Sequence, residues 1–340
     1  MTTNKQFSYA GMTLTRGSTN YDAKHSWLVK NLIRNKSLGV LYGMPDSFKS
    51  FTTIDLACSI ATGRKYHGEI TQQGAVVYIA AEGQQGISRR IKAWERTNNL
   101  LTNDLWVLGS SMPLNTPKAQ NDFIELIKQL EIAKKVKVEL IVIDTLARCM
   151  EGDENSPSDM GKFVRACDFI RGATNSSILC VHHSGKDINK GARGSNALVA
   201  SIDFEFKMKR IKGDIAVMLI NTKQKDADTA PPITIQYKQV DLGITCEEGL
   251  PITSLANLSQ HAPDTRNGIS NIIDIINKHP LKSMTRHELN QALFPSTSKI
   301  QDSDRQKIKR ALDTLIKKKL VTIEKKGVNS TKADIISIIH

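Results

Sequence analysis

Long apolar runs are missing from this chain of 340 residues. No stretch of eighteen or more apolar residues occurs, which excludes a membrane-spanning helix. The first residues, Met1 to Gln6, lead into no apolar segment, so we expect no secretory signal. With 40% hydrophobic and 24% charged residues, the composition is that of a globular protein with at least one sizeable core.

Cysteine is scarce, and its spacing suits neither disulfides nor zinc. No two cysteines form a C-x-x-C pattern, and most lie in apolar runs. We therefore expect buried free thiols in a reducing compartment. The five are Cys58, Cys149, Cys167, Cys180 and Cys246.

Negative charge is also in short supply. Asp and Glu number 34 against 47 Lys and Arg, which gives a net charge of +13 and a pI of about 9.4. Such an excess is common in proteins that bind polyanions; a basic protein of the cytosol without such a partner is the alternative. Residues 266–340 alone hold 15 Lys and Arg and 7 Asp and Glu, a net charge of about +8.

Between residues 38 and 239, short β-branched runs alternate with longer amphipathic stretches. This alternation predicts an α/β fold in which helices cover both faces of a mostly parallel sheet. The expected strands are residues 39–42, 75–80, 106–108, 140–143 and 177–181. Three further runs predict a meander at the edge of that sheet, namely residues 204–209, 215–220 and 233–237.

The chain divides into four parts by composition. We expect an N-terminal extension (1–37), a main domain (38–249), a linker (250–266) and a small C-terminal domain (267–340). The small domain has the order of a winged helix, with helices at 269–277, from 284 and at 304–318, then strands at 320–323 and 333–338. Thr285 and Glu288 are spaced as a capping box for its second helix.

The strongest local motif runs from Gly43 to Ser50. It follows a predicted strand and precedes an apolar helical run, which is the context of a phosphate-binding loop (P-loop). Backbone N–H groups there cradle phosphate, Lys49 reaches the β- and γ-phosphates, and the Ser50 hydroxyl binds Mg²⁺. We predict ATP and Mg²⁺ as ligands. The predicted nucleotide-contacting residues are Gly43, Pro45, Asp46, Ser47, Phe48, Lys49, Ser50 and Phe51.

One position departs from the usual P-loop pattern. Phe48 stands where the second glycine is normally found. We expect it to need a compatible backbone conformation and a side chain that points away from the nucleotide.

Two acidic residues follow predicted strands at the edge where a parallel sheet carries its active site. Asp144 ends the hydrophobic run 140–143, about 100 residues after the P-loop, which is the Walker B arrangement that holds Mg²⁺ through water. Glu82 lies just past the run 75–80, where a carboxylate can polarise the water that attacks the γ-phosphate. An ordinary loop acid is the alternative for Glu82.

Together these motifs resemble the RepA-like ATPases, RecA-fold enzymes of plasmids and phages related to hexameric replicative helicases. The resemblance covers residues 25–240 and rests on segments in a fixed order. They are 41–43, 48–50, 57–63, 77–83, 143–145 and 182–186. It implies a hexameric assembly in the cytoplasm of a bacterial host cell, with single-stranded DNA in a central channel.

The resemblance also implies roles for single residues. Glu82 matches the catalytic glutamate, Asp144 the Walker B aspartate, and either His182 or His183 the histidine that senses the γ-phosphate. A basic, glycine-rich loop after them matches the loop that touches DNA, with a solvated surface loop as the alternative; its cations are Lys186, Lys190 and Arg193.

A pair of lysines past residue 220, Lys223 and Lys225, matches the cations that such rings insert into the neighbour's ATP site. Both are lysines, where the family has a lysine with an arginine. Because lysine offers a point charge and no bidentate fork, slower hydrolysis is consistent with this change.

The basic C-terminal domain has two possible uses, and charge favours duplex DNA binding over docking of a protein. Its DNA-contacting candidates are Lys309, Arg310, Lys325 and Lys326. Three functions remain open from sequence: a ring-forming helicase in phage or plasmid replication, a replication initiator or loader without unwinding activity, and a transcription regulator with an ATPase switch.

Overall fold

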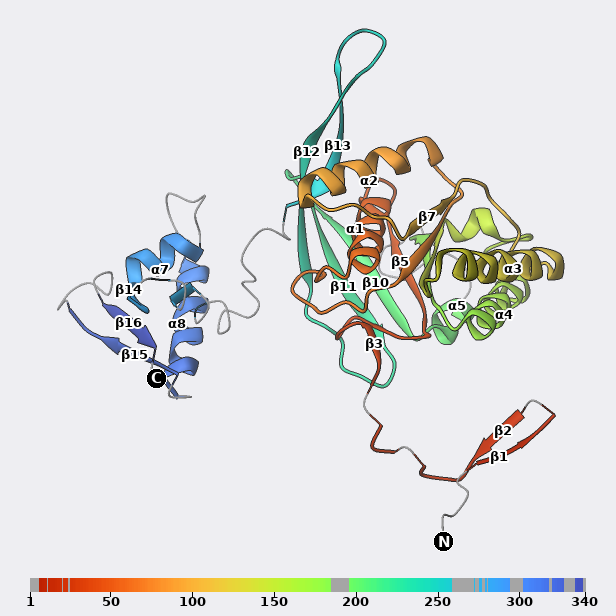
Figure 1. Cartoon of the computed structure of the whole chain (residues 1–340), viewed down its shortest axis with the longest axis horizontal. Helices are drawn as coiled ribbons and strands as arrows, with labels where there is room; N and C mark the ends of the chain where they lie inside the picture. Colours follow the sequence, from red (N-terminus) through yellow and green to blue (C-terminus); the bar gives the residue numbers. More distant parts are fainter. Residues whose placement is uncertain are drawn as a thin grey trace.

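The computed structural model describes residues 6–10, 12–19, 21–23, 25–184, 196–258, 272, 275–276, 279, 281–293, 302–317, 320–326 and 334–338. Within that part of the chain, a nine-stranded sheet forms the centre of the main domain (Figure 1), with strand order β13-β12-β11-β10-β5-β9-β8-β6-β7. Its strands are β5 (Leu38–Gly43), β6 (Ala75–Ala80), β7 (Leu105–Leu108), β8 (Val138–Asp144), β9 (Ser177–His183), β10 (Phe204–Ile211), β11 (Ala216–Gln224), β12 (Ile233–Thr245) and β13 (Pro251–Asn257).

The strands from β10 to β7 in this order run parallel to one another, and β11, β12 and β13 are added antiparallel at one edge. This confirms the predicted α/β fold with a mostly parallel sheet, which is consistent with a RecA-like P-loop ATPase core. Of the three predicted meander runs, 204–209 lies in β10, which pairs with the parallel β5, whereas 216–220 and 233–237 lie in the antiparallel strands β11 and β12.

Helices cover both faces of the parallel strands. Helices α1 (Lys49–Thr62) and α2 (Gln84–Asn98) pack on one face, and α3 (Pro117–Lys134) and α4 (Pro157–Thr174) on the other. Alternate side chains of β6 enter the two cores: Tyr78 joins the first and Ile79 the second, both fully buried. A strand covered on both faces has no polar side, which explains the continuous apolar runs. Two short elements complete this part of the chain: η1 (Leu146–Cys149) follows β8, and α5 (Asn196–Ser201) precedes β10.

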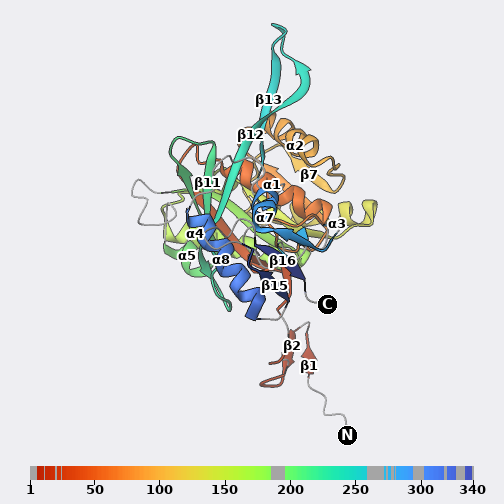
Figure 2. The same cartoon turned by 90° about the vertical axis from the view of Figure 1, so that its left-hand side faces the viewer.

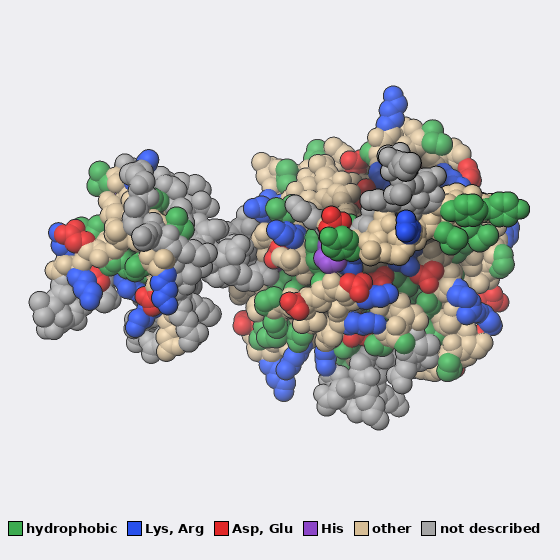
Figure 3. Space-filling view, turned by 90° about the horizontal axis from the view of Figure 1, so that it is seen from below, with side chains coloured by type: hydrophobic (Ala, Val, Ile, Leu, Met, Phe, Trp, Pro, Cys, Tyr) green, Lys and Arg blue, Asp and Glu red, His purple; other side chains and the backbone are tan. Residues whose placement is uncertain are grey.

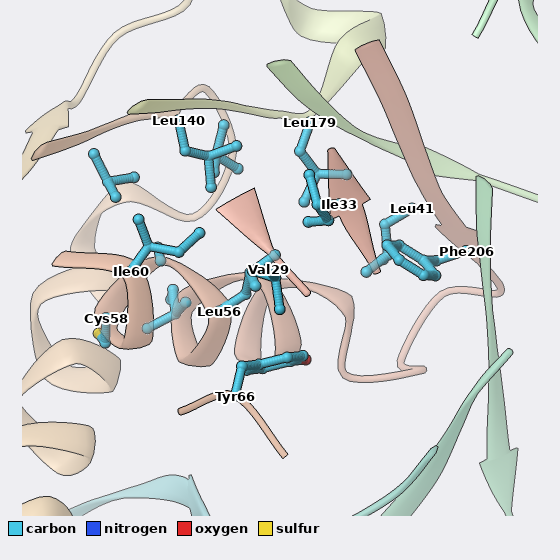
Figure 4. Close-up of a cluster of buried hydrophobic side chains, with 14 of the residues drawn as sticks. Val29, Ile33, Leu41, Leu56, Cys58, Ile60, Tyr66, Leu140, Leu179 and Phe206 are labelled. Atoms are coloured by element: carbon cyan, nitrogen blue, oxygen red, sulfur yellow. The ribbon is translucent and has the colours of Figure 1, made fainter. Parts of the chain in front are cut away.

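The first core also takes in part of the predicted N-terminal extension. Leu28, Val29 and Ile33, from the small hairpin of β3 (Trp27–Val29) and β4 (Ile33–Arg34), are buried against α1 and the sheet (Figure 4). The prediction of an N-terminal extension separate from the main domain up to residue 37 is therefore wrong for residues 27–34. Before them lies an exposed hairpin of β1 (Gln6–Tyr9) and β2 (Met12–Thr15).

The predicted linker is wrong for residues 251–257, which form the edge strand β13 paired with β12. Pro251 suggested a linker, yet a proline at the first residue of an edge strand removes no needed hydrogen bond. Of the other predicted linker residues, 250 and 258 flank this strand, and 259–266 lie outside the described residues.

The described C-terminal residues form a unit with its own hydrophobic core, built around Ile276, Leu289, Leu312 and Ile336. A sheet of order β14-β16-β15 accompanies two helices. The elements are β14 (Ser283–Thr285), α7 (Arg286–Leu293), α8 (Asp302–Lys317), β15 (Val321–Glu324) and β16 (Ile335–Ile338).

The predicted capping box in that unit is confirmed: Oε2 of Glu288 accepts from the Thr285 N–H at 2.7 Å, and Oγ1 of Thr285 accepts from the Glu288 N–H at 3.2 Å. The helix starts at Arg286, because residues 283–285 pair as a strand. Most of the predicted helix 269–277 lies outside the described residues. None of the described helices combines the length and apolarity that crossing a membrane requires.

Candidate functional site

The loop between β5 and α1 has the shape that the P-loop motif predicts. The Ser47 hydroxyl donates to the Met44 carbonyl at 2.7 Å, which closes a tight turn before Lys49 begins the helix. At Gly43, an added Cβ would lie 2.7 Å from the Ser47 hydroxyl and 2.9 Å from Cβ of Met208. Only glycine allows this close approach of backbone and neighbouring strand.

Phe48 adopts the left-handed backbone conformation, with φ of 59° and ψ of 25°, directly before α1. The expectation that a phenylalanine here needs a special backbone is confirmed. Its ring packs 5.4 Å from the ring of Tyr237 and 6.0 Å from that of Phe51. The guanidinium of Arg210 stacks on it at 5.0 Å. Aromatic packing therefore compensates for the missing glycine.

Lys49 is almost fully buried and donates from Nζ to the carbonyls of Gly43 and Met44, at 3.0 and 2.8 Å. Burial lowers the pKa of Lys49, and the nearby carboxylates of Asp144 and Glu82 partly oppose that shift. The ammonium group thus lies inside the loop, close enough to both predicted acidic residues for their charges to act on it.

Asp144 ends β8 and is buried, with 2% of its surface exposed. Its Oδ2 accepts a hydrogen bond of 2.5 Å from the Tyr78 hydroxyl, and the Ser50 side chain hydrogen-bonds the same carboxyl group. Burial raises the pKa of Asp144, while these two hydrogen bonds lower it. The structure therefore brings together a hydroxyl and a carboxylate, the hard oxygen donors that suit Mg²⁺.

Glu82 follows β6 at the same sheet edge. Its Oε1 accepts from the Thr145 hydroxyl at 3.1 Å and from Nε of Arg148 at 3.2 Å. Its other oxygen lies 4.0 Å from Nε2 of His183. The side chain of Glu82 is 37% exposed, so water reaches a carboxylate that its neighbours orient.

The two histidines differ sharply in their surroundings. His182 is completely buried, whereas the His183 side chain is 33% exposed and lies beside Glu82. His183 pairs in register with Gly43 of β5, at the start of the P-loop. Burial and, after it, the charge of Lys49 lower the pKa of His183. Of the two residues left open by sequence, His183 is the one at the site; its sensing role stays a prediction.

Lys223 and Lys225 lie at the other end of the sheet. In register, Lys223 faces Glu205 of β10, and Glu205 faces Val40, near the start of β5. Lys223 donates to the Val199 carbonyl at 2.7 Å, and Nζ of Lys225 lies 3.7 Å from Asp203. The structure thus separates both lysines from the P-loop of their own chain.

The predicted DNA-contacting residues are placed only in part. Lys186, Lys190 and Arg193 lie outside the described residues, as does the side chain of Arg310. Lys309, on α8, is exposed, as are Lys325 and Lys326 after β15. Figure 3 shows Lys and Arg side chains beside Asp and Glu on the surface of the C-terminal unit.

Four residues that sequence reasoning missed contribute to the site: Tyr78, Arg90, Arg148 and Tyr237. Arg90, on α2, stacks 4.5 Å over the Phe51 ring, and its charge opposes the rise in the pKa of Asp144 that burial causes. It shares a helix face with the buried Ile87 and Trp94, at spacings of three and four residues. This spacing, which places an arginine on the buried face of a helix, is the feature of the sequence that could have pointed to Arg90. Phe51 itself packs in the aromatic cluster with Phe48.

Comparison with known proteins identifies the region that carries these residues. A family model described as an AAA domain matches residues 6–189, more than half of the chain. The match spans the P-loop, Glu82, Asp144 and both histidines and ends before Lys223. A search of curated proteins found no match.

Proposed function

Because the chain belongs to the AAA domain family, whose members are ATPases, we propose that it is an ATP-hydrolysing, ring-forming DNA helicase or translocase. In this proposal it acts in phage or plasmid DNA replication. The observation that carries it is the hydrolytic site at one sheet edge, where Glu82 lies near Lys49, Asp144 and His183.

Each residue of the site has a task that its position supports. In this proposal Lys49, held by the loop carbonyls, contacts the β- and γ-phosphates, and Ser50 and Asp144 would supply oxygen ligands for Mg²⁺. The bound cation neutralises phosphate charge. Glu82, fixed by Thr145 and Arg148, accepts a proton from the attacking water and orients it.

The position of Lys223 and Lys225 supports the ring. Both lie at the sheet end opposite the P-loop, so neither serves the nucleotide of its own chain. In a ring, the same end faces another subunit, and a lysine there stabilises charge on the transferred phosphoryl group. The hexamer, which the resemblance to the RepA-like ATPases implies, belongs to the same proposal.

An unwinding assay on forked DNA with ATP and Mg²⁺ tests the function, with Glu82→Gln as the inactive control. Strand separation that needs ATP and Glu82 supports a helicase. Hydrolysis that DNA stimulates without strand separation would favour an initiator or loader. Hydrolysis indifferent to single-stranded DNA, with tight binding to one duplex sequence, would favour a transcription regulator.

A further inference from the structure

Strands β12 and β13 extend beyond the body of the sheet as a hairpin, which both Figure 1 and Figure 2 show projecting past α2. We call residues 243–251 the tip of this hairpin. Below the tip, Leu242 and Ala256 pack with Ala93 of α2 in a small separate core. Arg96 of α2 also lies against this part of the hairpin, because its Nη1 would be 2.6 Å from a Cβ added at Gly243. The hairpin therefore packs on α2 below the tip, and the tip itself is exposed.

The root of the hairpin is tied to the helix that carries the P-loop residues. The Tyr237 hydroxyl and Oγ1 of Thr52 lie 2.6 Å apart, both buried. At the other strand, Nδ2 of Asn257 donates to Oδ2 of Asp55 at 2.7 Å, again fully buried. Thr52 and Asp55 stand in the first two turns of α1, just after Lys49. A shift of α1 on nucleotide binding would thus move the hairpin.

The tip combines apolar and acidic side chains. Ile244 is 52% exposed and Leu250 61% exposed, and Glu247 and Glu248 stand between them in the turn. No Lys or Arg occurs between residues 239 and 258, in a chain that is otherwise strongly basic. Two glutamates repel a phosphate backbone, so this surface does not suit nucleic acid. It suits a surface that is both basic and apolar.

We propose that the tip docks on a second copy of this chain and reports the state of its own P-loop to that neighbour. Charge complementarity favours this partner, since the tip carries two acids and the chain as a whole has a net charge of +13. Two tips would repel each other, so the contact joins unlike surfaces, and contacts of that kind form a ring when the rotation between subunits closes. This inference rests on the proposed ring-forming function and adds the contact that makes assembly depend on nucleotide.

The test measures assembly of the full chain by mass photometry, with a non-hydrolysable ATP analogue and Mg²⁺. Two tip variants are compared with the wild type: Ile244→Ser with Leu250→Ser, and Glu247→Lys with Glu248→Lys. Ile132→Ser is the matched control, since Ile132 of α3 is 71% exposed and lies outside the hairpin. We expect both tip variants to need at least tenfold more protein to assemble, while affinity for a fluorescent nucleotide stays within twofold.

Assembly of both tip variants at the wild-type concentration would overturn the inference. Because the four tip residues are exposed, circular dichroism should match the wild type; if one variant pair misfolds, the other decides. ATPase activity of the wild type separates the two proposals. If the wild type assembles and hydrolyses ATP and the tip variants do the same, the tip inference alone fails. A wild type that never hydrolyses ATP contradicts the proposed function, and one that never assembles contradicts the tip contact as well.

Discussion

Nε2 of His183 lies 4.0 Å from Oε2 of Glu82, at the carboxyl end of the parallel strands. Because burial and the charge of Lys49 lower the pKa of His183, its ring is neutral at pH 7. The contact therefore leaves the Glu82 charge uncompensated on the side of His183. The positive partner of Glu82 is Arg148, on its other oxygen.

Replacing Glu82 with glutamine should separate nucleotide binding from hydrolysis. The Glu82→Gln variant keeps the shape of the side chain but cannot accept a proton from water, so we expect turnover to fall by roughly 10²-fold or more. Affinity for ATP should change little, because Lys49, Ser50 and Asp144 remain. A phosphate-release assay and a nucleotide-binding titration measure the two quantities. Glu125→Gln, on the exposed surface of α3, is the control; equal turnover in both variants would place the catalytic base elsewhere.

Acid should destabilise the folded chain through His183. An unfolded histidine has a pKa of about 6.5, and the folded one lies lower. As pH falls through about 6.5, the unfolded chain takes up this proton first, so the free energy of unfolding decreases until the folded ring is protonated too. Above that pH the contribution is constant. Urea unfolding between pH 5 and 8 should show a weaker pH dependence for His183→Gln than for the wild type; identical slopes would contradict this.

The backbone at Phe48 predicts an unusual order of stabilities. Both Phe48→Ala and Phe48→Gly lose the ring contacts with Tyr237 and Phe51. Alanine keeps the cost of the left-handed conformation, about 1 kcal/mol, and glycine does not. We expect the free energy of unfolding to fall from wild type to glycine and further to alanine, the reverse of the usual order within a helix. Chemical unfolding of the three proteins checks this, and an alanine variant as stable as the glycine variant would refute it.

Local patterns predicted most of the fold, and long-range contacts explain what they missed. The run 75–80 was predicted as a strand and is one, because a strand buried on both faces is apolar throughout. Strand β13 was missed, since its pairing with β12 compensates for a proline that looks like a linker signal. In the site, Lys49 and Ser50 follow from a contiguous motif. Tyr78 and Arg90 act on Asp144 from other elements, and spacing along the chain does not reveal such contacts.

The C-terminal residues 266–340, expressed alone, should fold and bind duplex DNA. The described part of this region has its own hydrophobic core, and the whole region carries a net charge of about +8. Each phosphate contacted should make log affinity fall by about 0.9 per log unit of salt. Fluorescence anisotropy with labelled duplex at several salt concentrations measures this slope. Absence of binding at low salt would assign the unit to protein docking instead.

The last prediction concerns which nucleotide Lys225 serves. The backbone N–H of Lys225 donates to the carbonyl of Asp203, and the N–H of Asp203 donates to the carbonyl of Leu38, the first residue of β5. Lys225 is therefore level with the start of β5, whereas the P-loop follows the end of this strand. Within one chain the lysine does not reach the phosphates. We therefore expect Lys225→Ala subunits to be nearly inactive in ATP hydrolysis, because each one lacks the lysine that acts on the ATP of the next subunit.

Mixing two inactive variants tests this directly. In a ring of Lys225→Ala and Glu82→Gln subunits, some interfaces combine an intact Glu82 from one subunit with an intact Lys225 from the next. Those interfaces should hydrolyse ATP, so the mixture should exceed the summed activities of the two parents. Mass photometry of subunits with different tags establishes that mixed oligomers form. Strictly additive activity in such oligomers would show that Lys225 does not act across the interface, because ATP hydrolysis in one subunit would then not depend on the lysine of its neighbour.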